Sequence, residues 1–154
     1  MNYKLIVATD EKGGIGKNNK IPWHFSDYSE HFSKITEGEG KNSVIMGRKT
    51  WDSLPIKPLP SRANLVMSTS GYSKGYCDVL AGFYKDNWVI GGEQIYNLYL
   101  PEVSHIYLTE IKGDYKCDTF FNIDYLKENF KLEKEKEIST EILTHRVYCR
   151  KQPR

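Results

Sequence analysis

Short apolar runs recur along the chain and are separated by glycines or by charged segments. Runs of about four to eight residues that are rich in Val, Ile and Leu are typical of strands buried in a sheet. They predict strands in YKLIVAT, SVIMG, RANLVMST, CDVLA, NWVI and HIYLTEI, which are residues 3–9, 43–47, 62–69, 77–81, 87–90 and 105–111. The segment DEKGGIGKNNKIPW (10–23) is rich in glycine and asparagine and is expected to be a loop.

Three segments between these runs carry helical signals. In SDYSEHFSKIT (26–36), Tyr28, Phe32 and Ile35 recur at helical spacing and predict one buried face. RKTWDSL (48–54) predicts a short helix, and GGEQIYNLYLP (91–101) predicts a helix that twin glycines open and a proline closes. Strands that alternate with helices indicate an α/β fold with a mainly parallel sheet.

The last part of the chain has looser apolar alternation and more charge. KLEKEKEIS (131–139) and EILTHRVYCRK (141–151) predict a solvent-facing antiparallel hairpin at the sheet edge. We therefore expect a single domain over residues 1–154, with a central, mainly parallel sheet of about eight strands flanked by helices. Ligands bind beyond the carboxyl ends of parallel strands, so the loops after residues 9, 47, 69 and 90 should line one crevice.

Composition narrows the class of protein. The chain has 154 residues, 39% of them hydrophobic and 27% charged, which is typical of a globular domain. A net charge of +2 with scattered signs indicates neither a nucleic-acid partner nor a membrane surface. The N-terminal apolar run is too short for a signal peptide. Cys77, Cys117 and Cys149 form no CxxC motif, which argues against a metal site and favours reduced thiols in the cytoplasm.

Two strand-to-helix turns suggest a phosphate site. In VIMGRKTW, a strand leads through Gly47 into a helix that begins with Arg48, Lys49 and Thr50, and unpaired N–H groups at a helix start suit an anion. In NWVIGGEQIY, the pair Gly91–Gly92 permits close approach of a ligand. An ordinary capped helix and a plain turn are the alternatives. Neither motif is GxGxxG, so an ordinary Rossmann nucleotide site is disfavoured.

The stretch IPWHFSDYSEHF (21–32) places one acid, Asp27, among aromatic residues. A carboxylate in apolar surroundings is costly unless something pairs with it. Asp27 is therefore either the acid of an active site or a helix cap, because Glu30 follows it three residues later as in a capping box. The two roles are compatible at a helix start.

Six fragments in order resemble the dihydrofolate reductase family: GIGKNNKIPWH, VIMGRKTWDSLP, PLPSRANLVMS, WVIGGEQIYNLYLP, IYLTEI and CDTFF. The resemblance covers nearly the whole chain. It implies reduction of 7,8-dihydrofolate to tetrahydrofolate, with a hydride passing from NADPH to pterin C6 and a proton reaching N5. It also implies a cytoplasmic monomer that acts on a small molecule.

The resemblance implies a cofactor site. The loop from Ile15 to Ile21 would close over the nicotinamide, and Arg48 would bind the 2′-phosphate of NADPH, with Ser68 and Thr69 at the adenosine end. The implied cofactor-binding residues are Ala8, Ile15, Gly16, Gly47, Arg48, Lys49, Thr50, Ser68, Thr69, Ile90, Gly91, Gly92, Glu93, Gln94, Ile95 and Tyr96.

The resemblance also implies a substrate site. Leu54 and Leu59 would clamp the aryl ring of folate, and Arg62 would bind the α-carboxylate of its glutamate tail. The implied substrate-binding residues are Ala8, Asp27, Tyr28, Phe32, Leu54, Leu59, Arg62, Ile90 and Thr109. The implied catalytic residues are Asp27, Trp23, Thr109 and Tyr96, and no metal is expected. Without the resemblance, Arg62 would pass for a solvated turn residue and Thr109 for an ordinary strand threonine.

The chain departs from the family pattern in two places. The family acid lies four residues before the pterin-facing Phe32, a position that Tyr28 occupies here, so Asp27 is displaced by one residue, which is about 100° on a helix. After the third strand, only AGFYKDN (81–87) remains where a helix walls the adenine site, so this site is expected to be open or to use Phe83 and Tyr84.

These departures leave two alternative functions. One is a pyrimidine reductase of riboflavin synthesis, against which the PLPSR element (58–62) argues. The other is a catalytically weak or non-enzymatic relative that binds folate or a nucleotide.

Overall fold

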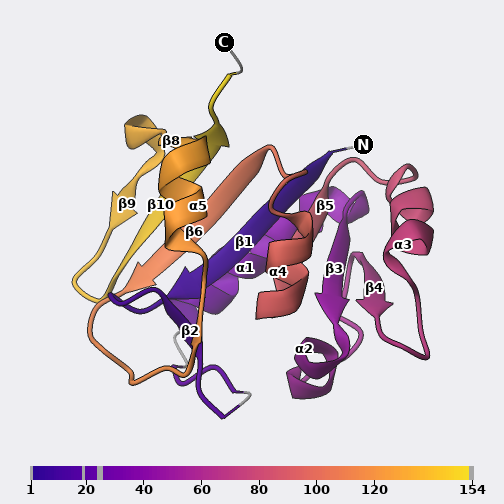
Figure 1. Ribbon diagram of the computed structural model, residues 1–154, viewed down its shortest axis with the longest axis horizontal. Helices are drawn as coiled ribbons and strands as arrows, with labels where there is room; N and C mark the ends of the chain where they lie inside the picture. The colour runs from indigo at the N-terminus through magenta and orange to yellow at the C-terminus, as the bar shows by residue number, and fades with distance from the viewer. Residues whose placement is uncertain (1, 19, 24–25, 153–154) are drawn as a thin grey trace.

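The computed structural model describes residues 2–18, 20–23 and 26–152, with residues 26 and 27 described by their backbone alone. An eight-stranded sheet forms its centre, in the order β4-β3-β5-β1-β6-β10-β8, with β9 also paired to β10 (Figure 1). The strands are β1 (Tyr3–Thr9), β3 (Ser43–Gly47), β4 (Ala63–Met67), β5 (Asn87–Gly91), β6 (His105–Ile111), β8 (Phe130–Leu132), β9 (Ile138–Ser139) and β10 (Leu143–Arg150).

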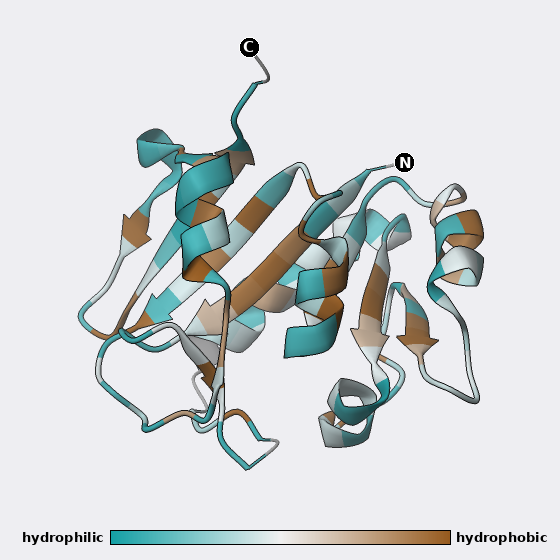
Figure 2. Ribbon diagram, in the orientation of Figure 1, coloured by the Kyte–Doolittle hydropathy of each residue, from teal (hydrophilic) through white to brown (hydrophobic). Residues whose placement is uncertain are grey.

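Strand direction follows the pattern expected from the sequence. The pairs β1–β5, β1–β6, β3–β4 and β3–β5 are parallel, whereas β10 runs antiparallel to β6, β8 and β9. The expectation of a mainly parallel sheet with an antiparallel C-terminal edge is therefore confirmed. The central strands are buried on both faces, since Leu5, Ile6 and Val7 are each at most 1% exposed. Figure 2 shows these strands as the most hydrophobic part of the ribbon.

Helices cover both faces of the sheet. The helix α1 (Ser26–Glu37) lies on one face, where Phe32 and Ile35 pack against Ile6 and Trp88. The helices α4 (Glu93–Tyr99) and α5 (Ile123–Asn129) lie on the other face (Figure 1), where Tyr99 and Leu126 join a second core. A short helix, α2 (Arg48–Ser53), follows β3 directly. No helix within the described ranges is both long and apolar enough to cross a membrane.

The segment after β4 corrects the sequence prediction. Residues 77–81, expected as a strand, belong to the helix α3 (Lys74–Ala81), and the Ser73 side chain caps its start by accepting from the Tyr76 N–H. Cys77 and Ala81 are both fully buried and lie at i and i+4, while Val79 is 66% exposed. This spacing is helical, and a run of five residues is too short to distinguish it from a strand. The shortened region therefore retains a helix, placed before residues 81–87.

Two short strands organise the loop that follows β1. The strand β2 (Gly14–Gly16) pairs antiparallel with β7 (Thr119–Phe120), so the expected loop is partly a small second sheet. The buried carboxylate of Asp10 holds this region together by accepting from the N–H groups of Lys12, Gly14 and Tyr115 at 2.8–3.0 Å. Nothing in the sequence pattern singled out Asp10.

Candidate active site

The carboxyl ends of β1, β5 and β6 meet beside α1. Ala8 on β1 lies directly opposite Thr109 on β6, and their exposed fractions are 8% and 1%. Tyr28 from α1 packs against the cluster that contains Ala8, Trp23, Ile111 and Leu143. The structure therefore brings Ala8, Tyr28 and Thr109, which are far apart in sequence, to one place.

Tyr28 occupies the position, four residues before Phe32, at which the family pattern has its acid. Its ring lies 6.2 Å from that of Phe32, one turn later on the same face of α1. Burial raises the pKa of the Tyr28 phenol, so the phenol is neutral at neutral pH. A neutral phenol has one oxygen and no charge, so it cannot accept two parallel N–H bonds as a carboxylate does.

The side chain of Asp27 lies outside the described part of the chain, although its backbone is the second residue of α1. Whether Asp27 faces the site or caps the helix stays a prediction. Its backbone position is one residue, or about 100°, away from Tyr28 around the helix.

The indole N–H of Trp23 is a buried donor at this site. The residue is 4% exposed, and its ring lies edge-on to Tyr115 at 5.3 Å. Within the described residues, its Nε1–H has no hydrogen-bond partner. Such a buried donor usually bonds to water or a ligand.

Tyr96 connects the two strands that flank the site. Its phenol lies 2.9 Å from the carbonyl oxygens of both Ile6 in β1 and Ile90 in β5. Burial, and then the nearby Tyr28, raises the pKa of Tyr96, so the phenol keeps its proton. Tyr96 is thereby fixed as a donor to backbone, with its ring edge-on to Phe121.

The two strand-to-helix turns lie side by side, as their sequences suggested. The peptide Gly91–Gly92 is cis, and Gly91 has a φ of 126°, a region that favours glycine. A Cβ atom on Gly91 or Gly92 would lie 3.5 or 3.7 Å from the Thr50 hydroxyl of the other turn. A Cβ atom on Gly47 would lie 3.1 Å from Ile95. Thr50 and the twin glycines thus form one polar corner that larger residues would fill.

The remaining residues of the two turns differ in placement. Glu93 and Gln94 are exposed at the start of α4, and a Glu93 carboxylate oxygen lies 3.5 Å from the Phe120 N–H of β7. Ile15 of β2 packs against the core, and Gly16 of the same strand pairs with Thr119 of β7. The loop that the resemblance assigns to the nicotinamide is thereby joined to β7.

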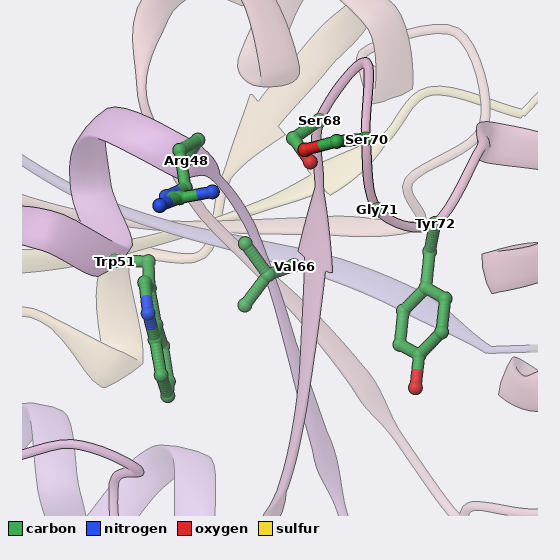
Figure 3. Close-up of a pocket in the computed structure, with 7 residues that line it drawn as sticks. All are labelled: Arg48, Trp51, Val66, Ser68, Ser70, Gly71 and Tyr72. Carbon is green, nitrogen blue, oxygen red and sulfur yellow. The ribbon is translucent and has the colours of Figure 1, made fainter.

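A cavity of about 300 Å³ lies between α2 and the turn after β4 (Figure 3). Arg48 and Trp51 reach it from α2, Val66 forms its floor, and Ser68 and Ser70 lie on the turn. The Arg48 side chain is 59% exposed, and its Nε lies 3.2 Å from an Asp52 carboxylate oxygen.

This cavity differs from expectation in its aromatic residue. Tyr72 lines it, whereas Phe83 and Tyr84, which were one alternative for stacking on the adenine beside a more open site, do not. Phe83 is 78% exposed beyond the end of α3, because the helix forms earlier in the chain than expected. Lys49 and Thr69 are exposed and do not line the cavity either.

The third group of expected residues lies near Phe32 and the C-terminal part of α1. Leu54, Leu59 and Ile90 pack with Phe32 in one apolar cluster. The Arg62 side chain, only 1% exposed, donates to Pro60 O at 2.7 Å, Thr36 Oγ1 at 2.8 Å and Glu37 Oε1 at 3.2 Å. Burial lowers the pKa of Arg62, though arginine remains charged in proteins. Three of its five N–H groups are used in these bonds, so its two terminal nitrogens each keep a second N–H.

Thr109 has a partner that the sequence did not reveal. Its Oγ1 lies 2.7 Å from Nδ1 of His145, which stands opposite it on β10. This pairing joins residues 36 positions apart and depends on strand register alone. Among the described residues, no three His, Cys, Asp or Glu side chains gather as a metal site would require.

Comparisons with known proteins show which family the chain belongs to. The sequence model of a family described as "Dihydrofolate reductase" matches residues 2–151. A dihydrofolate reductase of Ureaplasma parvum is 33% identical, covering 86% of this chain and 88% of the relative. One of Heliothis virescens is 36% identical, covering 92% and 89%, and one of Haemophilus influenzae is 37% identical, covering 79% of each.

Proposed function

Because the chain belongs to the dihydrofolate reductase family, we propose that it reduces 7,8-dihydrofolate to 5,6,7,8-tetrahydrofolate with NADPH. The single observation that carries this assignment to the site is the meeting of Ala8, Thr109 and Tyr28 beside the corner of Thr50 and the twin glycines. The purified protein should consume NADPH, followed by its near-ultraviolet absorbance, only when dihydrofolate is present.

The fit of the cofactor is supported by the corner of Gly47, Thr50, Gly91 and Gly92, where the absence of Cβ atoms on three residues leaves backbone open beside the Thr50 hydroxyl. We propose that this corner binds the pyrophosphate and that the cavity of Arg48, Ser68 and Tyr72 binds the adenosine end with its 2′-phosphate. When bound, NADPH supplies the hydride for pterin C6. Tyr96 bonds to β1 and β5 at this point, and we propose that the loop from Ile15 to Ile21 would exclude water from the bound nicotinamide.

Two further groups of residues would position the substrate. We propose that the pterin lies between Ala8 and Phe32, with its 2-aminopyrimidinone edge on a carboxylate that fixes its orientation. Asp27 is the proposed carboxylate, because the neutral phenol of Tyr28 cannot supply the charge. The Trp23 N–H, which lacks a partner among the described residues, would hold a water at the site that delivers the proton to N5.

The tail of the substrate would extend past Leu54 and Leu59 to Arg62. The guanidinium is held in place by Thr36, Glu37 and the Pro60 carbonyl, and its two remaining N–H groups suit the fork of a carboxylate. This element supports dihydrofolate over a substrate without a glutamate tail. The pyrimidine reductase and the non-enzymatic relative are therefore not favoured.

We also propose that the protein acts as a monomer in the cytoplasm. Its three cysteines are free, which fits a reducing compartment. Light scattering of the purified protein tests the oligomeric state.

A further inference from the structure

Buried Thr109 and half-buried His145 form a pair behind the proposed substrate site. They face each other across β6 and β10, and the 2.7 Å between Oγ1 and Nδ1 is short for a neutral hydrogen bond involving nitrogen. Thr109 is 1% exposed, so its hydroxyl is desolvated and depends on the few groups around it. His145 has no part in the function proposed above.

A second histidine fixes the ring plane of His145. His31 of α1 stacks on it, with ring centroids 3.7 Å apart and planes inclined by 14°. Burial, and then His145 and Lys34, lowers the pKa of His31 to about 4, so His31 is neutral near neutral pH. The stack therefore puts an uncharged ring against His145 and leaves Nδ1 directed at Thr109.

The other described groups that face His145 come from two strands. The strand β9 places Ile138 opposite His145, and β6 contributes Thr109. Glu110 and Arg146, the next residues along β6 and β10, point to the other sheet face and pair at 3.6 Å. Lys34 of α1 acts on His31, where its charge helps to lower the pKa.

The chemistry of the pair depends on where Nδ1 carries its proton. A threonine hydroxyl has one hydrogen, so Thr109 can donate in one direction only. If Nδ1 is bare, Thr109 donates to it and offers only lone pairs to the site. If Nδ1 carries a hydrogen, Thr109 accepts from it and its own hydrogen is free to be donated into the site.

We infer that His145 is a positioning residue whose Nδ1–H donates to Thr109, so that the Thr109 hydroxyl donates to the carboxylate that binds the pterin edge. An ionised carboxylate only accepts hydrogen bonds, so a hydroxyl beside it is useful only as a donor. This inference rests on the proposed function, because it needs a carboxylate and a pterin next to Thr109.

A double-mutant cycle on the whole protein tests the route through Thr109. His145→Phe keeps a ring to stack on His31 but removes both nitrogens, and it should raise the KM for dihydrofolate about 5- to 30-fold. The KM for NADPH should stay within about twofold, since the cofactor corner is on other strands. In a Thr109→Val background, His145→Phe should change the KM for dihydrofolate less than about twofold. His145→Asn, whose amide can donate in place of Nδ1, should recover most of the loss.

The proton itself is tested by nitrogen NMR of ¹⁵N-histidine-labelled wild-type protein, with His145→Asn used to assign the signal. A protonated Nδ1 is expected, and a bare Nδ1 overturns the inference even if His145→Phe does not fold. An equal effect of His145→Phe with and without the Thr109 hydroxyl also overturns it. Wild-type protein without turnover would remove the proposed function and the inference together, whereas active wild type with an unaffected His145→Phe removes the inference alone.

Discussion

At the scale of single residues, the displaced acid is the main question. The structure places Tyr28 on the face of α1 that meets Ala8 and Trp23, and the side chain of Asp27 lies outside the described part of the chain. The position of Tyr28 was predictable from the spacing of Phe32, because helical periodicity fixes which residues share a face. The buried environment that keeps the phenol neutral was not predictable, because β6 and β10 supply part of it.

Asp27→Asn and Tyr28→Phe separate the two candidates. If Asp27 is the acid, Asp27→Asn should lower kcat roughly 10²–10⁴-fold at neutral pH, the usual scale for a lost acid–base group. Stability should change little, because Asn caps a helix about as well as Asp. Tyr28→Phe should cost less than about tenfold, since it removes only a neutral hydroxyl. If steady-state kinetics instead show the larger loss of kcat for Tyr28→Phe, Tyr28 is the catalytic group and Asp27 serves only as a cap.

Arg62→Gln tests the tail contact. It should raise the KM for dihydrofolate and leave that of a tail-less dihydropterin nearly unchanged, because only the former has a carboxylate for the guanidinium. It should also lower stability by about 1–3 kcal/mol, since the buried bonds to Thr36 and Glu37 are lost. Glu37→Gln is the matched control, because it weakens the ion pair with Arg62 but keeps the guanidinium that would bind the substrate carboxylate. Equal losses for both substrates would make Arg62 a structural residue.

At the scale of elements, prediction succeeded where a run was long or its turn residues were clear. The strands at residues 3–9, 43–47 and 105–111 have the expected bounds, and the Gly91–Gly92 turn begins α4 as expected. The helix α3 was missed because the run CDVLA (77–81), with only Cys77 and Ala81 buried, is too short to distinguish a helical period from a strand. This error also affected the site, because the aromatic residue that lines the cavity is Tyr72.

Arg48→Ala tests the cavity that α2 shares with the turn after β4. It should weaken binding of NADPH far more than of NADH, by about 1.5–3 kcal/mol, because a charge-assisted bond to the 2′-phosphate is lost. Lys49→Ala is the control, since Lys49 is an exposed cation next in sequence that does not line the cavity. Fluorescence titration with both cofactors measures the difference. An equal loss for NADPH and NADH would contradict the assignment of Arg48.

At the scale of the whole molecule, the free energy of unfolding should depend on pH through His31 of α1. Its pKa is lowered from 6.5 to about 4 in the folded protein, chiefly by burial, so the unfolded chain binds this proton more readily. The folded state should therefore lose stability as pH falls from about 6.5 to about 4, and lose no more from this group below that.

Urea unfolding at a series of pH values measures this coupling. His31→Asn should remove a slope worth on the order of 1 kcal/mol over that window, a value reduced for the partial exposure of the ring. Lys34→Met should make the slope shallower, because Lys34 is one cause of the lowered pKa. Unchanged slopes in both variants would show that His31 titrates normally in the folded protein.

The contact between Gly14 and Cys117 makes the reactivity of this thiol sensitive to the position of β2. A Cβ atom on Gly14 would stand 2.6 Å from Cys117 Sγ, so the strand β2 covers this thiol, and burial, then Asp10, raises its pKa. A thiol reagent should therefore react faster with Cys117 when β2 moves away. In a Cys149→Ser background, with Cys77 fully buried, we expect the labelling rate of Cys117 to report on movement of β2 (Gly14–Gly16).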